Sequence, residues 1–343
     1  MGLKILIIGS GGREHAISWI ISKSKRAIEK IFVMPGNAGT LTEKNVFNIE
    51  CDINNHKAVL NFALENKIDL TIVGPEVPLV KGISDLFEEK NLNIFGPKKY
   101  FAQLEGSKVF SKNFMDSNNL PTAKYKEFND SKKAKEYLDD KKMPIVIKYD
   151  GLAAGKGVDI CETIDDAKKS VDNLLKPEAR IIIEDFIKGI ELSAIYICNP
   201  NANKKNIGLT WVKDYKSRDE YNSGPNTGGM GAVTHPFCSF KKNDIYSLNV
   251  EIEKILIKTI VAINNGSGTA SKYNGFMYLG LMISTNDDKP YLLEYNCRMG
   301  DPETQNILMY LDKNEVDFLD LIGFDNSYYP CLLYTSDAAD DGL

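Results

Sequence analysis

The sequence predicts an α/β protein in which a Rossmann-like domain with a parallel sheet comes first and a mixed α+β unit follows. Short apolar runs alternate with helical stretches over residues 1–100, a pattern typical of parallel strands joined by right-handed crossovers. From about Lys108 the pattern changes, and antiparallel strands follow. The length of 343 residues is enough for two or three domains, each with its own core.

Buried strands in the first hundred residues are predicted at 3–8, 31–34, 70–73 and 93–95. A one-sided apolar pattern predicts a helix over residues 15–24. Turns rich in glycine follow three of these strands, at residues 9–12, 35–39 and 74–76. We expect all three turns at the carboxyl ends of the strands, where open α/β sheets bind ligands.

The second part of the chain begins with a predicted helix over residues 108–117 and a small unit that runs to about Phe186. Its elements are strands at 145–148, 157–161 and 180–184, with a helix at 164–175. The last group comprises strands at 191–198 and 206–212, a long helix at 244–263, and a hairpin of 276–284 with 291–295.

Composition narrows the class of protein. The formal net charge is −5, whereas proteins that bind nucleic acid usually carry a basic surplus. No apolar run approaches the roughly 20 residues that span a bilayer, and residues 1–9 predict a strand rather than a secretion signal. The six cysteines form no Cys-x-x-Cys pair, which favours reduced thiols. We therefore expect a cytoplasmic monomer whose partners are small molecules, and neither nucleic acid nor a membrane.

The most informative stretch is the apolar run near residue 292 with the polar residues that follow it. Alternate side chains of a strand share a face, so Glu294, Asn296 and Arg298 would point the same way. Carboxylate and amide oxygens suit Mg²⁺, whose octahedron is usually completed by nucleotide phosphates. With the guanidinium, this face could hold Mg²⁺ and a phosphate together. The alternative is an edge strand with a solvated polar face.

The turn Gly9-Ser10-Gly11-Gly12-Arg13-Glu14 predicts a phosphate site, because free backbone N–H groups at a helix start favour an anion. It does not fit a dinucleotide site. The third glycine of that fingerprint would fall at Glu14, and Pro35 and Gly36 stand where an acidic residue is expected. We favour a sugar-phosphate site over NAD, with a plain tight turn as the alternative.

A second glycine-rich segment, residues 148–158, resembles a phosphate-binding P-loop without its spacing, since Lys156 is followed by Gly157 instead of Ser or Thr. A glycine loop between antiparallel strands can still fold over phosphates. Lys148 ends an apolar strand, where a buried lysine would need an anion. Lys108 begins a helix, where its charge opposes the helix dipole. Each lysine alone is more often a surface residue, but together they indicate bound phosphate.

An extended segment at residues 182–187 could bind an adenine through its backbone, with a following carboxylate on the ribose hydroxyls. This signal is weak alone, because many strand ends look similar.

With these motifs in order, the chain resembles the ATP-grasp superfamily, and within it the phosphoribosylamine–glycine ligase (glycinamide ribonucleotide synthetase) family. The resemblance runs from Lys4 to about Asp312. Its most specific motifs are Gly-Gly-Arg-Glu-His-Ala (11–16), Pro-Gly-Asn-Ala-Gly-Thr (35–40), Val-Gly-Pro-Glu (73–76), Leu-Glu-Gly-Ser-Lys (104–108), Asp-Gly-Leu-Ala-Ala-Gly-Lys-Gly-Val (150–158), Gly-Pro-Asn-Thr-Gly-Gly-Met-Gly-Ala (224–232) and Glu-Tyr-Asn-Cys-Arg-Met-Gly-Asp-Pro-Glu-Thr-Gln (294–305).

The resemblance implies a division of the chain. A phosphosugar-binding domain would occupy residues 1–103, and an ATP-grasp domain residues 104–324, with a small lid at about 124–190. Residues 325–343 do not resemble the family, which continues into a further C-terminal domain. We interpret the last dozen residues as a truncation or assembly scar, with a divergent tail as the alternative.

The implied reaction joins glycine to 5-phosphoribosylamine with ATP, by way of a glycyl phosphate, and gives glycinamide ribonucleotide, ADP and phosphate in purine biosynthesis. A carboxylate is a poor electrophile, so the γ-phosphoryl group would activate it. Positioning and charge neutralisation would then do most of the catalysis.

The resemblance also implies a role for particular residues. Glu294 and Asn296 would bind Mg²⁺ or Mn²⁺. The catalytic residues would be Arg298, Asp214 and Lys216. The ATP-binding residues would be Lys108, Lys148, Gly155, Lys156, Gly157, Glu184, Asp185, Ile187 and Glu191. The substrate-binding residues would be Gly11, Gly12, Arg13, Glu14, Gly74, Pro75, Glu76, Gly228, Gly229, Gly300 and Asp301, and a loop at residues 224–231 would lie over the reacting groups.

The sequence departs from the family at Tyr215 and Ser217, where the family has His and Arg, and at Asn222, where it has Asp. The loss of an imidazole and a cation near the substrate would weaken binding. Hairpin strand 276–284 carries no carboxylate, which leaves Glu294 as the one acid from this hairpin for the metal. Two alternatives stay open: an ATP-grasp carboxylate–amine ligase with other substrates, and a nucleotide-binding core made inactive by truncation.

Overall fold

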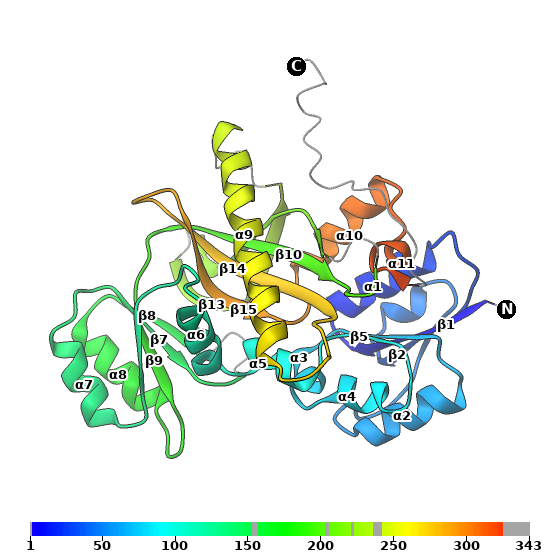
Figure 1. Cartoon of the computed structure of the whole chain (residues 1–343), viewed down its shortest axis with the longest axis horizontal. Coiled ribbons are helices and arrows are strands. Elements are labelled where there is room, and N and C mark those ends of the chain that lie inside the picture. The colour runs from blue at the N-terminus through cyan, green and yellow to red at the C-terminus, as the bar shows by residue number, and fades with distance from the viewer. Residues whose placement is uncertain (1, 153–156, 203–205, 221–222, 236–241, 325–343) are drawn as a thin grey trace.

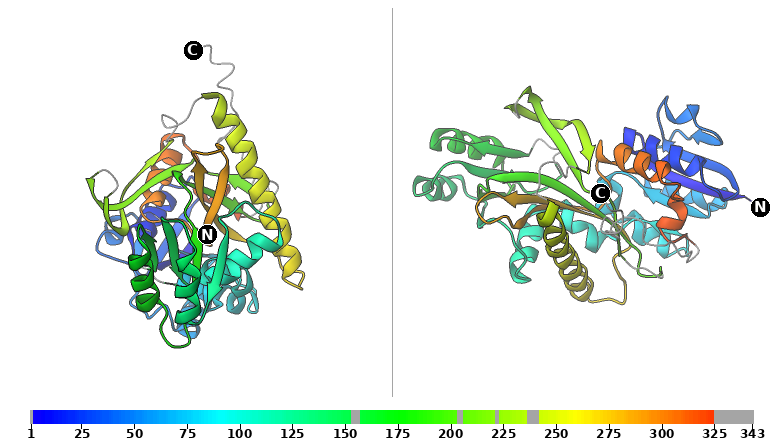
Figure 2. Two further views of the ribbon diagram at one scale, coloured as in Figure 1. Left: turned by 90° about the vertical axis from the view of Figure 1, so that its left-hand side faces the viewer. Right: turned by 90° about the horizontal axis from the view of Figure 1, so that it is seen from above.

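The structure, a computed structural model, describes residues 2–152, 157–202, 206–220, 223–235 and 242–324 (Figure 1). Within these ranges three β-sheets follow one another along the molecule. Figures 1 and 2 agree in placing the first sheet at one end, a small sheet at the other end and the largest sheet between them. No helix in the described ranges has both the length and the apolar character that crossing a bilayer requires.

The N-terminal sheet is parallel, as the sequence predicted, with strand order β3-β2-β1-β4-β5. Strand β1 is apolar from Ile5 to Ile8 and these residues have no exposed surface, because helices cover both faces of such a sheet. Its strands are β1 (Leu3–Gly9), β2 (Ile28–Pro35), β3 (Val46–Asn48), β4 (Leu70–Val73) and β5 (Ile94–Phe95), and its helices are α1 (Gly12–Ser22), the short 3₁₀ helix η1 (Thr40–Thr42), α2 (His56–Glu65), α3 (Glu76–Val80), α4 (Ile83–Glu88) and α5 (Lys99–Gly106).

The small sheet, here called the lid sheet, is antiparallel with order β6-β9-β7-β8. Its elements are β6 (Tyr125–Phe128), α7 (Ser131–Asp139), β7 (Ile145–Tyr149), β8 (Val158–Cys161), α8 (Ile164–Leu174) and β9 (Ile181–Asp185). These elements enclose an apolar core whose members all come from the lid itself. As predicted, β7 and β8 are antiparallel neighbours on either side of the glycine-rich segment.

The lid sheet contacts the rest of the protein through polar groups. Asp150, which follows β7, accepts hydrogen bonds from the Ser107 hydroxyl at 2.8 Å and from the Val109 backbone N–H at 3.1 Å. Lys148 donates a hydrogen bond to the Leu293 carbonyl oxygen at 3.1 Å. These bonds tie β7 and the residue after it to residues 107–109 and to Leu293.

The central sheet has the order β13-β12-β10-β14-β15, and β11 pairs with β10. Helix α9 packs on one face of this sheet, where its apolar side chains share a core with β10 and β14. The elements of this region are α6 (Lys108–Ser117), β10 (Gly189–Cys198), β11 (Asn206–Gly208), β12 (Val212–Asp219), β13 (Ser223–Thr234), α9 (Lys242–Gly266), β14 (Gly275–Ser284), β15 (Pro290–Asn296), α10 (Glu303–Lys313) and α11 (Phe318–Leu321). Helices α10 and α11 join the central sheet to α1 and the N-terminal sheet in one core.

The prediction of one strand over residues 206–212 is wrong, because β11 ends at Gly208 and β12 begins only at Val212. Leu209 and Trp211 are two residues apart and both are 1% exposed, yet they pack into different cores. In a regular strand they would lie on the same face. The ladder is therefore interrupted between β11 and β12.

The expected loop at residues 224–231 is also corrected, because it lies within β13, which pairs antiparallel with β12. Tyr215 pairs with Gly231 and Ser217 pairs with Asn226, so residues 227–230 oppose Lys216 alone. This bulge is held by the Thr227 hydroxyl, which donates to the Lys216 carbonyl oxygen at 2.8 Å. Helix α10 was not predicted at all.

Candidate active site

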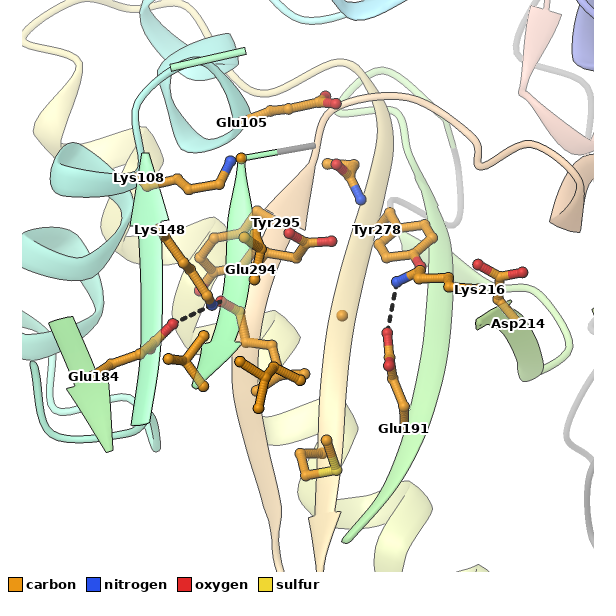
Figure 3. Close-up of a pocket in the computed structure, with 18 of the residues that line it drawn as sticks. Glu105, Lys108, Lys148, Glu184, Glu191, Asp214, Lys216, Tyr278, Glu294 and Tyr295 are labelled. Carbon is orange, nitrogen blue, oxygen red and sulfur yellow. Dashed lines mark hydrogen bonds and ion pairs between the residues drawn. The ribbon is translucent and has the colours of Figure 1, made fainter. Parts of the chain in front are cut away.

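A cavity of about 420 Å³ lies where the central sheet meets the lid sheet and the turns that follow the N-terminal sheet (Figure 3). Most of the predicted site residues line it, although they come from distant parts of the chain. Those in its wall are Arg13, Glu76, Lys108, Lys148, Gly157, Glu184, Asp185, Ile187, Glu191, Asp214, Lys216, Gly228, Glu294, Asn296, Arg298 and Asp301.

Some predicted residues are not in the wall. These are Gly11, Gly12, Glu14, Gly74, Pro75, Gly229 and Gly300. Gly155 and Lys156 lie outside the described residues, as do Asn222 and the expected non-family tail.

Glu14 is buried because it supports the first glycine turn from behind. Its carboxylate accepts a hydrogen bond from the Gly11 backbone N–H at 2.6 Å and forms an ion pair with the Arg13 Nε at 2.6 Å. A Cβ atom on Gly74 would lie 1.8 Å from Glu14 Oε1, so only glycine fits there. The residue that excluded a dinucleotide site from sequence therefore shapes the turn without facing the cavity.

Arg13 itself reaches the cavity from the first glycine turn. Its Nη1 donates to the Met299 carbonyl oxygen at 3.1 Å, and its backbone N–H donates to Asp301 at 3.3 Å. The turn after β1 is thereby joined to the segment after β15. The two motifs, almost 300 residues apart in sequence, form one surface of the cavity.

Glu294 and Asn296 project from β15 into the cavity, and Arg298 follows just past the end of the strand. Burial acts to raise the pKa of Glu294, but the charges of Lys216, Lys108, Lys148 and Arg298 together hold this pKa below its usual value. A Cβ atom on Gly280, which pairs with Glu294, would lie 2.9 Å from Glu294 Cγ. Gly280 thus leaves the room that the carboxylate occupies.

A buried ion-pair network connects the cavity to the lid sheet. Glu184 on β9 pairs with both Lys148 on β7 and Lys112 on α6, and all three side chains are less than 10% exposed. The anion expected beside Lys148 is therefore Glu184. Lys112 also donates to the Thr122 hydroxyl at 2.6 Å, and burial lowers its pKa to about 8 although Glu184 opposes this.

Lys112 was missed from sequence. It lies one helical turn after Lys108, so the two lysines are neighbours on the same face of α6, and that spacing was the available signal. Lys108 forms no ion pair with any described residue and faces the cavity.

A second ion pair crosses the cavity wall between β12 and β10, where Lys216 Nζ lies 2.6 Å from Glu191 Oε1 (Figure 3). Burial acts to lower the pKa of Lys216, but Tyr278, Glu191 and Glu294 together raise it. Tyr215 and Ser217, the neighbours that depart from the family pattern, are absent from the wall. Alternation along β12 turns them away from the face that carries Asp214 and Lys216.

Asp214 Oδ1 is buried and makes no hydrogen bond with the described residues. Burial, followed by the charge of Glu303, raises the pKa of Asp214 to about 7. Glu303 is 3% exposed and accepts a hydrogen bond from the Tyr278 hydroxyl at 3.0 Å, and the Ser193 hydroxyl lies 2.6 Å from the same Tyr278 oxygen. Sequence reasoning missed both residues. Tyr278 lies in a hairpin strand that was noted only for its lack of a carboxylate, and Glu303 lies within the 294–305 motif but was given no role there.

Apolar residues form the part of the wall nearest the lid. Ala123, Val146, Ile160, Phe186, Met282 and Leu293 line it, next to Asp185 and Ile187. An apolar slot with backbone groups at its edge suits a flat heterocyclic base.

The donor set fits a hard cation that takes most of its ligands from a bound phosphate. No group of three or more His, Cys, Asp or Glu side chains suited to a metal occurs in the described part of the chain. Glu294 and Asn296 offer one carboxylate and one amide oxygen in the same wall. Mg²⁺ typically takes one or two carboxylates in addition to phosphate oxygens and water.

Comparison with known proteins agrees with this architecture. The family model described as "Phosphoribosylglycinamide synthetase, N domain" matches residues 3–105, and "Phosphoribosylglycinamide synthetase, ATP-grasp (A) domain" matches residues 106–304. Phosphoribosylamine–glycine ligase of Clostridium acetobutylicum is 43% identical over 327 residues, which are 93% of this chain and 74% of the relative. The enzyme of that name from Escherichia coli is 41% identical over 321 residues, 92% of this chain and 72% of the relative.

Among solved structures, phosphoribosylamine–glycine ligase of Thermotoga maritima is similar with a TM-score of 0.75 and 31% identity, covering 96% of this chain and 78% of that chain. N5-carboxyaminoimidazole synthetase of Staphylococcus aureus shares the fold at a TM-score of 0.69 with 16% identity, covering 96% and 79%.

Proposed function

The chain belongs to the phosphoribosylglycinamide synthetase family, and from this we propose that it is an ATP-dependent carbon–nitrogen ligase that joins glycine to 5-phosphoribosylamine. The products are glycinamide ribonucleotide, ADP and phosphate, and the reaction belongs to de novo purine biosynthesis. The observation that carries the proposal is the convergence of Glu294, Asn296 and Arg298 with three lysines in one cavity between three sheets.

The reaction proceeds in two transfers. The carboxylate oxygen of glycine attacks the γ-phosphorus of ATP, so that a glycyl phosphate forms and ADP leaves. The amine of phosphoribosylamine then attacks the acyl carbon, an amide bond forms, and phosphate leaves. Both transfers depend on positioned reactants and on cations that neutralise the moving charge.

Lys108, Lys148 and Lys156 contact the phosphates, with backbone groups from Gly155 and Gly157. Lys108 forms no ion pair with the described residues, whereas Lys148 already pairs with Glu184. The adenine lies in the apolar slot against the backbone of Asp185 and Ile187, and Glu191 binds the ribose hydroxyls. The last contact requires Glu191 to exchange its partner Lys216 for the nucleotide.

Glu294 and Asn296 would hold the divalent cation, Mg²⁺ or Mn²⁺, which would neutralise the charge of the phosphates when it is bound. The lowered pKa of Glu294 supports this role, because a metal ligand must be ionised. Arg298 stabilises the transferring phosphoryl group and the acyl phosphate.

Asp214 accepts the proton that the attacking amine loses. Its Oδ1 has no hydrogen-bond partner among the described residues, and its pKa of about 7 suits a base at neutral pH. Lys216 stabilises the negative charge beside it. The ribose phosphate of the substrate lies on the first glycine turn, where Gly11, Gly12 and Arg13 meet Asp301. Two further groups of residues complete this substrate site. They are Glu14, Gly74, Pro75 and Glu76 on one side, and Gly228, Gly229 and Gly300 on the other.

The proposed division is a phosphosugar-binding domain over residues 1–103 and an ATP-grasp domain over residues 104–324, with a lid at 124–190. The chain spans 74% of the Clostridium relative. We propose that the protein works in the cytoplasm as a monomer on small-molecule substrates.

Phosphate release by the purified chain with Mg-ATP, glycine and freshly generated phosphoribosylamine tests the proposal, with each substrate omitted in turn. Release should require all three, and should disappear in Glu294→Ala while Glu136→Gln, an exposed lid residue, behaves like the wild type. Release with another amine or acid in place of these substrates would indicate a different carboxylate–amine ligase. ATP that raises the melting temperature without any phosphate release would indicate a nucleotide-binding core alone.

A further inference from the structure

We propose that Glu105 positions Arg298 and thereby acts in the ligase reaction, an inference that rests on the proposed function. Glu105 is near the end of α5, lines the cavity and is 6% exposed. A carboxylate with so little access to water needs partners inside the protein. The groups that contact Glu105 indicate its role.

One oxygen of Glu105 anchors the carboxylate to the backbone after β15. Glu105 Oε2 accepts a hydrogen bond from the Cys297 backbone N–H at 2.8 Å and a second from the Cys297 thiol at 3.0 Å. Both bonds are buried, so water does not compete for them. They fix the direction of the carboxylate relative to the chain at the end of β15.

The other oxygen faces the guanidinium of the next residue. Arg298 Nη2 lies 3.0 Å from Glu105 Oε1. Glu76 Oε2 is also close, 3.4 Å from Arg298 Nε, but this nitrogen makes no hydrogen bond with the described residues. Burial acts to lower the pKa of Arg298, and Glu105 is the strongest of the charges that raise it, ahead of Glu76. Glu105 is therefore the principal partner of the guanidinium.

Together these contacts close a small ring. Glu105 holds the backbone of Cys297 and the side chain of Arg298, directly after the strand that carries Glu294 and Asn296. The Arg298 Nη1 donates to the Met299 carbonyl oxygen at 3.2 Å, which restricts the guanidinium further. Rotation of Arg298 away from the proposed metal ligands would break contacts on both sides.

Glu105 also stands beside the start of α6. Ser107, two residues later, caps this helix by accepting a hydrogen bond from the Phe110 backbone N–H at 3.1 Å. Lys108 is the first residue of the helix. One short segment thus sets the positions of two cavity cations, Lys108 through the helix and Arg298 through the carboxylate.

The contacts assign an indirect role. Both oxygens of Glu105 are engaged by protein groups, so it is a positioning residue and Arg298 is the group that meets the phosphoryl. A displacement of about 1 Å in such a group can lower the rate about 10²-fold. If Glu105 only stabilised the fold, its substitution would not reduce the rate of the chemical step alone.

Glu105→Gln is the informative substitution, because it keeps the shape and an oxygen for the Cys297 N–H while it removes the charge. We expect kcat to fall about 10²-fold, with the KM for ATP unchanged. The loss of a buried charge pair should also lower the melting temperature, so the assay is run where the variant is folded. Glu88→Gln is the matched control. It removes a carboxylate that pairs with Lys98 at 2.5 Å, next to α5 but outside the cavity, and should leave kcat unchanged.

Chemical rescue separates positioning from general damage. Guanidinium ion added to Arg298→Ala should restore part of kcat by occupying the place beside Glu105. The same concentrations should not rescue the double variant Glu105→Gln/Arg298→Ala. Equal rescue of both variants would overturn the inference. Full activity of Arg298→Ala without guanidinium would overturn the role of Arg298 in the proposed function, and this inference with it.

A crystal structure of Glu105→Gln gives a readout that needs no activity. The Arg298 guanidinium should leave its position between Glu76 and residue 105 while Glu294 and Asn296 stay in place. An unchanged Arg298 in a folded Glu105→Gln variant would contradict the positioning role even if the chain proved inactive as a ligase.

Discussion

Lys148 and Glu184 form a buried ion pair across neighbouring strands of the lid sheet, and the same carboxylate pairs with Lys112 from α6. One negative charge is therefore shared by two buried positive charges. The group carries a net positive charge beside the cavity, whose wall includes Lys148 and Glu184, and this charge favours an anionic ligand.

Glu184→Gln should destabilise the fold, because it leaves two buried lysines facing each other without their carboxylate. Breaking a buried pair typically lowers the free energy of unfolding by about 3–5 kcal/mol. Urea denaturation measures this change. The control Glu136→Gln removes an exposed pair with Lys132 at 4.0 Å, for which less than about 1 kcal/mol is expected. Similar losses in both variants would contradict the importance of the network.

Asp214→Asn should be more stable than the wild type at pH 8, and the difference should shrink as the pH falls toward 4. The pKa of Asp214 is raised from 3.8 to about 7 in the folded chain. Between these values the folded state keeps a proton that the unfolded state releases, so stability falls as pH rises. Melting temperatures of both proteins across pH 4–8 measure the effect, and parallel curves would refute it.

The activity of the wild type should rise with pH through about 7, because Asp214 must be ionised to accept the proton of the amine. The pH profile of kcat/KM for phosphoribosylamine measures this limb. In Asp214→Asn the activity that remains should lack it. A limb that persists in the variant would assign the proton acceptor to another group.

Gly280→Ala should displace Glu294, since the new Cβ would lie 2.9 Å from Glu294 Cγ. The Mg²⁺ concentration needed for half-maximal phosphate release should rise about 10-fold, as is typical when the support of a metal ligand is lost. Gly231→Ala is the control, because a Cβ there meets nothing within 4 Å. If the two variants require the same Mg²⁺ concentration, Glu294 is not the residue that binds it.

Tyr215→His and Ser217→Arg, which restore the family pattern, should change the KM for phosphoribosylamine by no more than about 2-fold, since surface substitutions usually contribute within about 0.5 kcal/mol. Neither residue lines the cavity. Lys216→Met on the same strand should raise this KM much more. A large decrease of KM in the restored variants would show that these side chains reach the substrate.

Much of the fold could be predicted because local patterns determine it. The run from Leu3 to Ile8 is apolar at nearly every position, which is typical of a strand covered on both faces. The break between β11 and β12 could not be predicted, because the spacing of Leu209 and Trp211 fits a single strand. Only the folded structure shows that they pack into two separate cores.

The site residues also divide into those that could be predicted from the sequence and those that could not. Glu294 and Asn296 could be placed on one face from strand alternation alone. Tyr278 and Glu303 could not, because their hydrogen bond joins residues that only the packing of α10 on the central sheet brings together. Lys112 is intermediate, since its spacing from Lys108 was visible but its partner Glu184, 72 positions later, was not.

The lid sheet keeps its apolar core to itself, and its bonds to the rest of the protein include the polar contacts of Asp150 and Lys148. Moving the lid would exchange these contacts for water without opening that core. Heat capacity changes in proportion to the apolar surface that becomes hydrated. Lid movement should therefore contribute little to the heat capacity change of nucleotide binding. The change that calorimetry measures should come mainly from burial of the adenine in its apolar slot.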